Sequence, residues 1–358
     1  MITGLLILSV VMYGCFILWL ALNIKVQRPA SYKSAAISII IPARNEEAHI
    51  DACLNSIVRQ DYDLAKVEVI VMDDSSVDST AEIAGMFKDR LNLRVIKSTS
   101  VGKKQGLKQG IESASSDIIL TTDADCVAGD LWLGTMTAMF LGNDLHMLCG
   151  PIEFSGRSWL QQLQKAESAA IVGMSAVMLN KGMPATCNGA NLMFRKDVFN
   201  RLGGYDTHAH IMSGDDDLLM QRFAKDNPGK VSYMLNKDAI VTTRAAQDMN
   251  ELLAQRKRWL SKRHAYLYPY NKRVQALVVI HLLAFYFVGG IWLSVYFWPT
   301  FSLLAFKYMA DLIYGIRLKA VFSFRLADVL LMPFYQLYIF LLPFYGKSLE
   351  WKGRKING

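Results

Sequence analysis

Two aspartates one residue apart, Asp123 and Asp125, are the residues of this chain whose type and spacing most directly suggest chemistry. They follow a short apolar run, residues 118–122, that is typical of a buried strand. Alternate residues of an extended segment point to the same side, so both carboxylates would face one place. Paired carboxylate oxygens suit Mg²⁺ or Mn²⁺, which also binds substrate phosphates. The pair indicates a metal site for a nucleotide diphosphate, although two acids at a strand end are also common in solvated turns.

Polar segments also follow two earlier apolar runs. They contain Pro42, Arg44 and Glu46 after residues 37–41, and Asp73 and Asp74 after residues 67–72. Acids at such positions can cap the next helix or meet its dipole. Two adjacent acids exceed what a cap needs, so Asp73 or Asp74 could accept hydrogen bonds from a nucleobase. Lys103, at the start of a further helical stretch, could lie near a phosphate or in a solvated basic turn.

Two later segments add acids and a basic, aromatic motif. Asp215, Asp216 and Asp217 are consecutive and precede a helical stretch, where a helix N-terminus rich in Asp explains two of them more easily than three. Gln255, Arg258 and Trp259 lie on a basic amphipathic stretch. A basic helix beside a membrane would explain the charges of that stretch, but not Gln255 and Trp259 at this spacing.

The elements that must position these residues alternate between strand-like and helix-like runs. The strand-like runs are residues 37–41, 67–72, 93–96 and 118–122, and the helical runs between them are residues 47–60, 79–88 and 103–113. This alternation predicts an α/β fold with a mostly parallel sheet. Ligands of such sheets bind at the carboxyl ends of the strands, where the polar residues lie. We expect one soluble domain over residues 34–245.

Long apolar segments flank that domain. Residues 1–23 carry no charge, and Lys25, Arg28 and Lys33 follow, which predicts a transmembrane anchor with the domain on the cytosolic side. Residues 274–345 are rich in apolar side chains and predict two to three further spans, with a break at Trp298 and Pro299. Residues 246–273 would be an amphipathic interface helix, and residues 346–358 a basic tail.

The composition limits the classes of molecule that the protein is expected to bind. The net charge is +8 and 52% of the residues are hydrophobic, but the basic residues cluster beside the apolar segments, where anionic lipid headgroups explain them. No aromatic and basic surface typical of nucleic-acid binding is evident, so nucleic acid is not an expected partner. The five cysteines form no C-x-x-C pair and are expected to be reduced thiols.

The order of these motifs resembles the membrane-bound family-2 glycosyltransferases of the GT-A fold, a group that includes ceramide glucosyltransferase and the hyaluronan, chitin and cellulose synthases. The resemblance covers residues 37–266 and the flanking apolar pattern. It depends on the ordered set of Asp73-Asp74, the D-x-D at Asp123, the acidic residues at Asp215 and the Q-x-x-R-W at Gln255.

The resemblance implies a role for each matching residue. The nucleotide-sugar would be bound by Pro42, Arg44, Glu46, Asp73, Asp74, Lys103, Asp123, Gln255, Arg258 and Trp259. Asp123 and Asp125 would hold Mg²⁺ or Mn²⁺, Arg258 would face the pyrophosphate, and Trp259 would stack near the acceptor. Either Asp215 or Asp216 would be the catalytic base, depending on which motif residues are matched, and we favour Asp216.

The function expected from this resemblance is inverting transfer of a sugar from a UDP-sugar to a membrane lipid or lipid-linked acceptor. A processive polysaccharide synthase of the hyaluronan or chitin type is one alternative. A membrane transporter with a nucleotide-binding cytosolic domain is another, which the scarcity of paired charges in the apolar segments disfavours. The expected location is a membrane, most readily the bacterial inner membrane, with several spans and a cytosolic catalytic domain.

Overall fold

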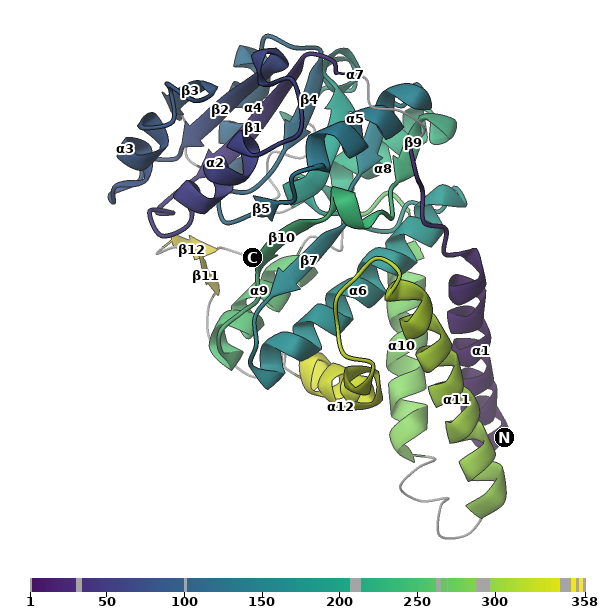
Figure 1. Cartoon of the computed structure of the whole chain (residues 1–358). Helices are drawn as coiled ribbons and strands as arrows, with labels where there is room; N and C mark the ends of the chain where they lie inside the picture. Colours follow the sequence, from purple (N-terminus) through teal and green to yellow (C-terminus); the bar gives the residue numbers. More distant parts are fainter. Residues whose placement is uncertain are drawn as a thin grey trace.

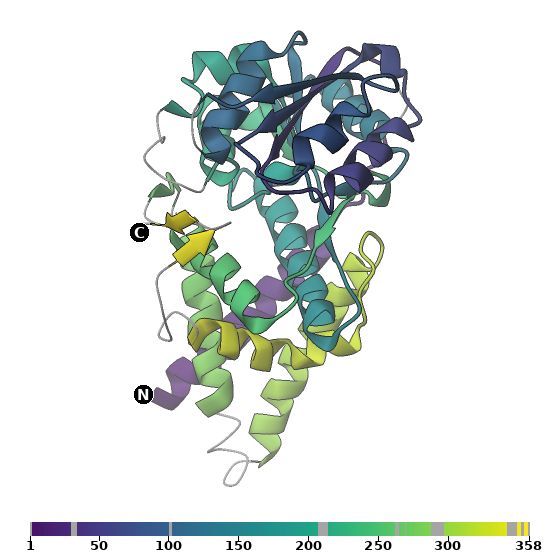
Figure 2. The ribbon, with the colours of Figure 1, turned by 90° about the vertical axis from the view of Figure 1, so that its left-hand side faces the viewer.

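The computed structural model describes residues 2–29, 34–99, 102–206, 214–261, 265–268, 270–287, 297–341, 349–351 and 354–356. Within these ranges the chain has two parts (Figures 1 and 2). An α/β part contains the strands of the main sheet, and a helical base extends from one end of it. The first helix and the last helices of the chain lie together in this base, although they are far apart in the sequence.

A seven-stranded sheet, in the order β3-β2-β1-β4-β8-β6-β9, forms the centre of the α/β part. Its strands are β1 (Ile37–Ala43), β2 (Val67–Asp73), β3 (Asn92–Lys97), β4 (Ile118–Thr121), β6 (Met147–Cys149), β8 (Leu192–Arg195) and β9 (Val231–Tyr233). The first four strands are parallel, while β8 runs antiparallel to both of its neighbours. The α/β class and the mostly parallel sheet predicted from the sequence are therefore confirmed.

The strands predicted from apolar runs lie within two residues of their expected ends. They form because β-branched side chains pack well on a pleated surface that is covered on both faces. Ile39, Ile40 and Ile41 of β1 and Val69 and Val71 of β2 are fully buried in this way. The helices of this region are α2 (Ile50–Val58), α3 (Thr80–Gly85), α4 (Lys103–Ser113) and α5 (Trp132–Gly142), and α4 has the predicted bounds.

A small second sheet joins the α/β part to the base. It has the order β5-β10-β7, with β5 (Val127–Ala128), β7 (Ile152–Ser155) and β10 (Val241–Arg244). Short elements complete this region: α7 (Lys196–Arg201), α8 (Asp217–Asp226), and the 3-10 turns η1 (Leu64–Lys66), η2 (Gly189–Asn191), η4 (Pro228–Lys230) and η5 (Lys237–Ala239). Since β5 follows the turn that holds Asp123 and Asp125, the small sheet lies directly beside the candidate metal site.

The helical base is built around α6 (Trp159–Asn180). Its other helices are α1 (Ile2–Asn23), α9 (Met249–Ser261), α10 (Tyr270–Phe287), α11 (Phe297–Leu318) and α12 (Ala327–Leu341). A capping box starts α6, because Ser158 and Gln161 each bond the other's backbone N–H. The residues 346–358 expected as a basic tail include a two-stranded hairpin, β11 (Leu349–Trp351) and β12 (Arg354–Ile356), and the rest of that tail lies outside the described residues.

The apolar segments do form helices, but not quite as expected. The sequence predicts a break at Trp298 and Pro299, whereas both residues lie in the first turn of α11. Proline is well tolerated there, because the first N–H groups of a helix have no partner within it. Within the part of the chain that the structure describes, no helix has the combined length and hydropathy that crossing a membrane requires. The spans expected in residues 1–23 and 274–345 are therefore not confirmed.

Candidate active site at the end of strand β4

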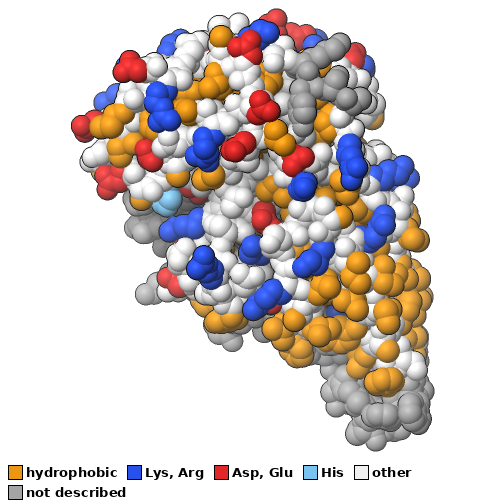
Figure 3. Space-filling view, in the orientation of Figure 1, with side chains coloured by type: hydrophobic (Ala, Val, Ile, Leu, Met, Phe, Trp, Pro, Cys, Tyr) orange, Lys and Arg blue, Asp and Glu red, His pale blue; other side chains and the backbone are white. Residues whose placement is uncertain are grey.

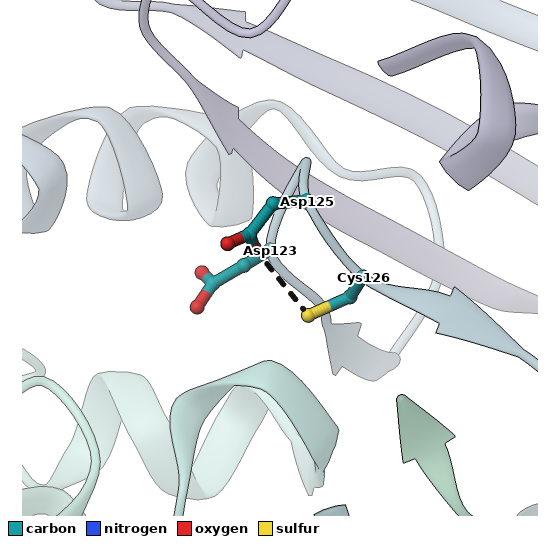
Figure 4. A group of neighbouring side chains, drawn as sticks. All are labelled: Asp123, Asp125 and Cys126. Carbon is teal, nitrogen blue, oxygen red and sulfur yellow. Dashed lines mark hydrogen bonds between the residues drawn. The ribbon is translucent and has the colours of Figure 1, made fainter. Parts of the chain in front are cut away.

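The aspartate pair lies in a turn directly after β4, not on the strand itself. The backbone N–H of Cys126 donates to the carbonyl of Asp123 at 3.0 Å and closes the turn. Figure 4 shows the side chains of Asp123 and Asp125 next to each other. Ligand atoms of Asp123, Asp125 and Cys126 all lie within 4.8 Å of one another, and the Cys126 thiol donates to Asp125 Oδ1 at 3.6 Å. The two carboxylates thus converge as the sequence predicted.

These carboxylates suit a hard divalent cation. Mg²⁺ and Mn²⁺ prefer oxygen ligands and leave coordination positions for substrate phosphates, so Asp123 and Asp125 fit such an ion. The sulfur of Cys126 is a softer donor. Burial, together with the charges of Asp125 and Asp123, raises the pKa of the Cys126 thiol well above its ordinary value. The two carboxylates are therefore the members of this group that fit Mg²⁺ or Mn²⁺.

Lys103 connects the aspartate pair to the acidic triplet. It is the first residue of α4, after Gly102, whose φ of 113° is one that a residue with a side chain rarely adopts. Its Nζ lies 2.8 Å from Asp123 Oδ1 and 3.1 Å from Asp215 Oδ2. Burial opposes the charge, but Asp123 and Asp215 outweigh it and raise the pKa of Lys103 well above its ordinary value. One ammonium group thus holds acids from two distant segments together.

The three consecutive aspartates have three different environments. Asp217 is fully buried and accepts hydrogen bonds from the Thr186 hydroxyl (2.7 Å), the Cys187 N–H (2.8 Å) and the Tyr266 hydroxyl (2.8 Å). A buried carboxylate with three donors is a structural anchor for the segments it joins. The third acid, which a helix N-terminus explained poorly, is therefore explained by this anchoring.

Asp216 and Asp215 are only half-buried. Asp216 is the N-cap of α8, where its Oδ1 accepts from the Asp217 N–H at 2.7 Å. Asp215 faces Lys103, as described above. Gly189 lies close to both acids, since a Cβ on it would be 3.2 Å from Asp215 Oδ2 and 3.6 Å from Asp216 Cβ. The structure thus brings Asp215 and Asp216 next to the aspartate pair, with the backbone of Gly189 beside them.

Asn191 fixes the segment that carries Gly189. Its side-chain NH₂ donates to the carbonyls of Pro151 and Ala239, both at 2.8 Å, and its Oδ1 accepts from Trp132 Nε1 at 3.0 Å. This buried amide therefore ties η2 to α5 and to the edge of the small sheet. A fully satisfied buried amide of this kind determines one loop conformation, because any other would leave its polar atoms without partners.

The loops after β1 and β2 are joined by a set of hydrogen bonds. The Arg44 guanidinium donates to the carbonyls of Asp74 (2.6 Å) and Ser75 (3.2 Å). Asn45, with φ of 51°, accepts from the Val77 N–H at 3.0 Å. These bonds join the loops after β1 and β2 into one wall at the carboxyl edge of the sheet. The wall contains the residues predicted to bind the nucleotide-sugar.

The carboxylates of this wall are largely buried. Asp73 Oδ1 accepts from the Ser76 N–H at 3.1 Å, and Asp74 Oδ2 accepts from the Gly102 N–H at 3.2 Å, which links Asp74 to the residue before Lys103. At the start of α3, the side chain of Asp78 accepts a hydrogen bond from the Thr80 N–H at 3.1 Å. Asp73 and Asp74 are therefore not the caps of α3.

Pro42 and Glu46, the two other predicted residues of this wall, also have partners in the structure. Pro42 is in β1, in register with Met72 of β2. Glu46 Oε2 lies 3.2 Å from His49 Nδ1, and the Glu46 N–H donates to the Thr80 hydroxyl at 2.8 Å. These contacts fix the first turn after β1.

The Q-x-x-R-W residues lie on α9, which follows β10 in the chain. Gln255 Oε1 accepts from Arg256 at 2.8 Å, and the Trp259 ring lies 4.3 Å from the Arg256 guanidinium carbon. Arg258 is half-buried on the same helix. The contacts of Gln255 and Trp259 are therefore with their neighbour Arg256, and the described contacts do not connect them to the acidic cluster.

Some residues of the site were missed by sequence reasoning. Thr243 of β10 directs its hydroxyl toward Asp125 Oδ2 at 3.5 Å, although it is 118 positions away. Thr186 and Tyr266, which are 31 and 49 positions from Asp217, donate hydrogen bonds to its carboxylate. No local pattern marks a single Thr or Tyr as such a partner. Cys126 alone carried a signal, because it directly follows the D-x-D.

Comparison with known proteins agrees with this geometry. Residues 38–203 match the family model described as Glycosyl transferase family 2. The glycosyltransferase AglE of Haloferax volcanii is 30% identical over 183 residues, which are 50% of this chain and 58% of that protein. A poly-beta-1,6-N-acetyl-D-glucosamine synthase of Staphylococcus epidermidis is 29% identical over 175 residues, which are 48% of this chain and 42% of the synthase. The chain thus matches about half the length of these relatives.

A solved structure extends the likeness in fold. The mannosyltransferase PcManGT from Pyrobaculum calidifontis, in complex with GDP-Man and Mn²⁺, aligns with a TM-score of 0.58 at 16% identity. The alignment covers 94% of this chain and 99% of that one, so it includes the helical base. At this identity the likeness concerns the fold alone. The likeness and the sheet topology give the chain an α/β fold of the GT-A type, and the family 2 match applies to residues 38–203.

Proposed function

We propose that this protein is an inverting glycosyltransferase that moves a sugar from a UDP-sugar to the hydroxyl group of a membrane lipid or lipid-linked acceptor. The observation that carries the proposal is the meeting of Asp123, Asp125, Lys103 and Asp215 at the carboxyl end of β4. Carboxylates for a divalent cation beside a fixed ammonium group are what a departing diphosphate requires. The family 2 domain gives this cluster its chemical context.

In this proposal the donor binds along the carboxyl edge of the sheet. The wall formed by the loops after β1 and β2 would hold the nucleoside, with Asp73 or Asp74 accepting hydrogen bonds from uracil. Asp123 and Asp125 would hold Mg²⁺ or Mn²⁺, which supplies positive charge to the diphosphate. The PcManGT complex, which has a similar fold, contains Mn²⁺ together with GDP-Man, and this supports a divalent ion in the proposed reaction. Lys103 would donate to the same phosphate oxygens.

Asp216 is the proposed base. Asp217 is excluded because it is buried and already accepts three hydrogen bonds, and Asp215 is engaged by Lys103. In the transfer step Asp216 takes the proton of the acceptor hydroxyl, and the hydroxyl oxygen forms the new bond to the anomeric carbon. The bond between that carbon and the diphosphate oxygen breaks, and UDP leaves with the electron pair. Attack from the side opposite to UDP inverts the anomeric centre.

The membrane acceptor is supported by the surface of the helical base. Figure 3 shows hydrophobic side chains gathered over the region of α1 and α11, with Lys and Arg side chains between this region and the α/β part. The exposed large apolar residues of the base include Leu8, Met12 and Leu22 of α1, Phe301, Met309 and Ile316 of α11, and Leu330, Leu331 and Phe334 of α12. An apolar surface bordered by basic residues suits a bilayer with anionic headgroups. We propose that this base holds the enzyme to the membrane, with the catalytic domain on the cytosolic side.

The test is UDP release by the purified full-length chain. UDP-sugars are screened with Mn²⁺ and a membrane-lipid extract, and the labelled product is analysed. We expect release that depends on one sugar and on lipid, that EDTA abolishes and Mn²⁺ restores. Asp216→Asn and Asp123→Asn are each expected to lower the rate by about a hundredfold or more. Glu82→Gln, a matched loss of charge on the exposed face of α3, serves as the control and retains the rate.

Other outcomes would select another function. A product that carries many sugar units would identify a processive synthase, the alternative supported by the polysaccharide synthase among the relatives. Binding of nucleotide without release of UDP under any condition would contradict the transferase and favour a transporter with a nucleotide-binding domain.

A further inference from the structure

Arg256 lies between the residues of the Q-x-x-R-W motif, but the motif itself does not require an arginine at this position. It is 6% exposed, which is unusual for an arginine on an amphipathic helix. Its guanidinium donates to Gln255 Oε1 at 2.8 Å and covers the Trp259 ring at 4.3 Å. Two residues of the motif are thus oriented by a third residue of the same helix.

The same guanidinium joins α9 to two other helices of the base. It forms an ion pair with Glu167 of α6 and a hydrogen bond of 3.4 Å with the Tyr335 hydroxyl of α12. The Tyr335 hydroxyl in turn donates to Glu167 Oε2 at 3.0 Å. Arg256, Glu167 and Tyr335 therefore close a buried polar triangle, which we call the α9 clamp.

The chemistry of the clamp requires an arginine. A planar guanidinium can bind a carboxylate, a hydroxyl and an amide oxygen at once and still stack on an indole ring, which a lysine ammonium cannot do. A buried ion pair of this kind adds little stability over well-packed apolar side chains, so stability alone is a weak reason for it. What the clamp does provide is a fixed position for Gln255 and Trp259 relative to α6 and α12.

We propose that Arg256 is a positioning residue for the acceptor side of the reaction. Through the clamp it sets the position of Trp259, the residue expected to stack near the acceptor, while donor binding depends on the acidic cluster at β4. This inference rests on the proposed transferase function. The proposed role also gives a reason for the contact between the clamp and α12. Leu330, Leu331 and Phe334 of that helix are exposed on the helical base, where a membrane acceptor would approach.

The experiment separates positioning from folding. Arg256→Met and Glu167→Leu each leave a buried charge without its partner, so both single variants should melt at a lower temperature than the wild type. The double variant Arg256→Met/Glu167→Leu removes both charges and should regain most of the melting temperature. We expect its acceptor KM to remain raised by about tenfold or more, with the Kd for UDP-sugar within about twofold of the wild type.

Tyr335→Phe and Arg244→Met complete the series. Tyr335→Phe keeps the ring but removes the hydroxyl and should raise the acceptor KM by a smaller factor. Arg244 pairs with Glu251 at 2.8 Å on the exposed N-terminal turn of α9, so Arg244→Met is a matched control that should leave both constants unchanged.

Two results would overturn the inference. One is a double variant whose acceptor KM returns to the wild-type value together with its melting temperature. The other is a parallel loss of donor and acceptor binding, which would make the clamp a purely structural element. A wild-type protein that releases no UDP with any UDP-sugar and lipid would instead contradict the proposed function. The proposed role of Arg256 would then be wrong as well.

Discussion

Lys103 joins the two acidic segments of the site, since it contacts both Asp123 and Asp215. The Lys103→Met variant would leave these carboxylates facing each other without a cation, and a donor diphosphate would lose a charged hydrogen-bond donor. We expect the Kd for UDP-sugar in the presence of Mn²⁺ to rise by about tenfold to a hundredfold, which calorimetry would measure.

Lys108 provides the control for this experiment. It lies on the same helix but pairs with Asp206 at 2.7 Å on the surface. Lys108→Met should leave the Kd for UDP-sugar unchanged. An unchanged Kd in Lys103→Met as well would show that the ammonium group organises the acids but does not contact the donor.

At the scale of elements, the contact between α6 and α11 depends on Gly173. A Cβ at this position would lie 2.3 Å from Leu318 Cδ2 and 2.8 Å from the Tyr314 hydroxyl, which donates to the Ala170 carbonyl at 2.7 Å. The two helices can approach this closely only because the glycine has no side chain. Gly173→Ala should therefore lower the free energy of unfolding by about 1–3 kcal/mol, measured by denaturant titration.

Gly85 is the matched control on α3. A Cβ at this position would meet nothing within 4 Å, and its backbone conformation suits any residue. Gly85→Ala should leave stability unchanged or raise it by about 0.4–1 kcal/mol, because alanine restricts the unfolded chain. If Gly173→Ala were equally neutral, the interface of α6 and α11 would be looser than the structure indicates.

The elements that the sequence predicted well are those with a strong local signal. Strands β1 to β4 are apolar, β-branched runs, and α4 begins at Lys103, directly after Gly102. Strands β6, β8 and β9 have only three or four residues each, and their pairing joins segments far apart in the chain. Such strands have no pattern of their own, because their position is decided by the sheet that they join.

In the candidate site, too, the residues with a strong local sequence signal were the ones predicted well. The D-x-D and the acids after β2 could be placed at one edge of the sheet, because the carboxyl ends of parallel strands meet there. The sequence placed the acidic triplet only at the start of a helix, and its part in the site came from the family resemblance. The sequence could not predict that the three aspartates of the triplet have different contacts and roles. Asp217 is an anchor only because Thr186, Cys187 and Tyr266 come together around it in three dimensions.

At the scale of the whole molecule, acid stability of the α/β part depends on Glu68. This buried carboxylate accepts hydrogen bonds from Ser38 (2.5 Å), Ser115 (2.8 Å) and Arg94 (2.6 Å), and so joins β1, β2 and β3. Burial alone would raise the pKa of Glu68, but these hydrogen bonds outweigh burial and lower it below its ordinary value. The carboxylate therefore stabilises the folded state.

The direction of the pH dependence follows from this lowered pKa. The stabilisation is fully present above the unfolded value of about 4.5 and is lost as the pH falls through the folded value. Glu68→Gln should cost about 1–3 kcal/mol at pH 7 and much less at pH 3, as measured by denaturant unfolding. The exposed Glu82→Gln should cost little at either pH, and an equal cost of Glu68→Gln at both pH values would contradict this account.

In the proposed function, the helical base is the part of the molecule that would meet a membrane. Substituting serine for Leu330, Leu331 and Phe334 on α12 removes three large exposed side chains, each worth about 1.5–3 kcal/mol when transferred out of water. After detergent removal with vesicles of phosphatidylcholine and phosphatidylglycerol, we expect the wild type to float with the lipid. The serine variant should float at least about tenfold less, if these side chains enter the bilayer.

The control for flotation introduces serine at exposed apolar positions outside the helical base. Val77 and Met86 are 88% and 66% exposed in the α/β part, far from the base, and serine at both positions should not change flotation. Equal losses in the two variants would contradict a specific membrane face. Because the Lys and Arg side chains beside the base would meet anionic headgroups, binding of the wild type should also weaken in vesicles of phosphatidylcholine alone. A wild type that remained dispersed in the aqueous fraction with both lipid mixtures would remove the main support for a membrane acceptor, while leaving the acidic cluster at β4 unaffected.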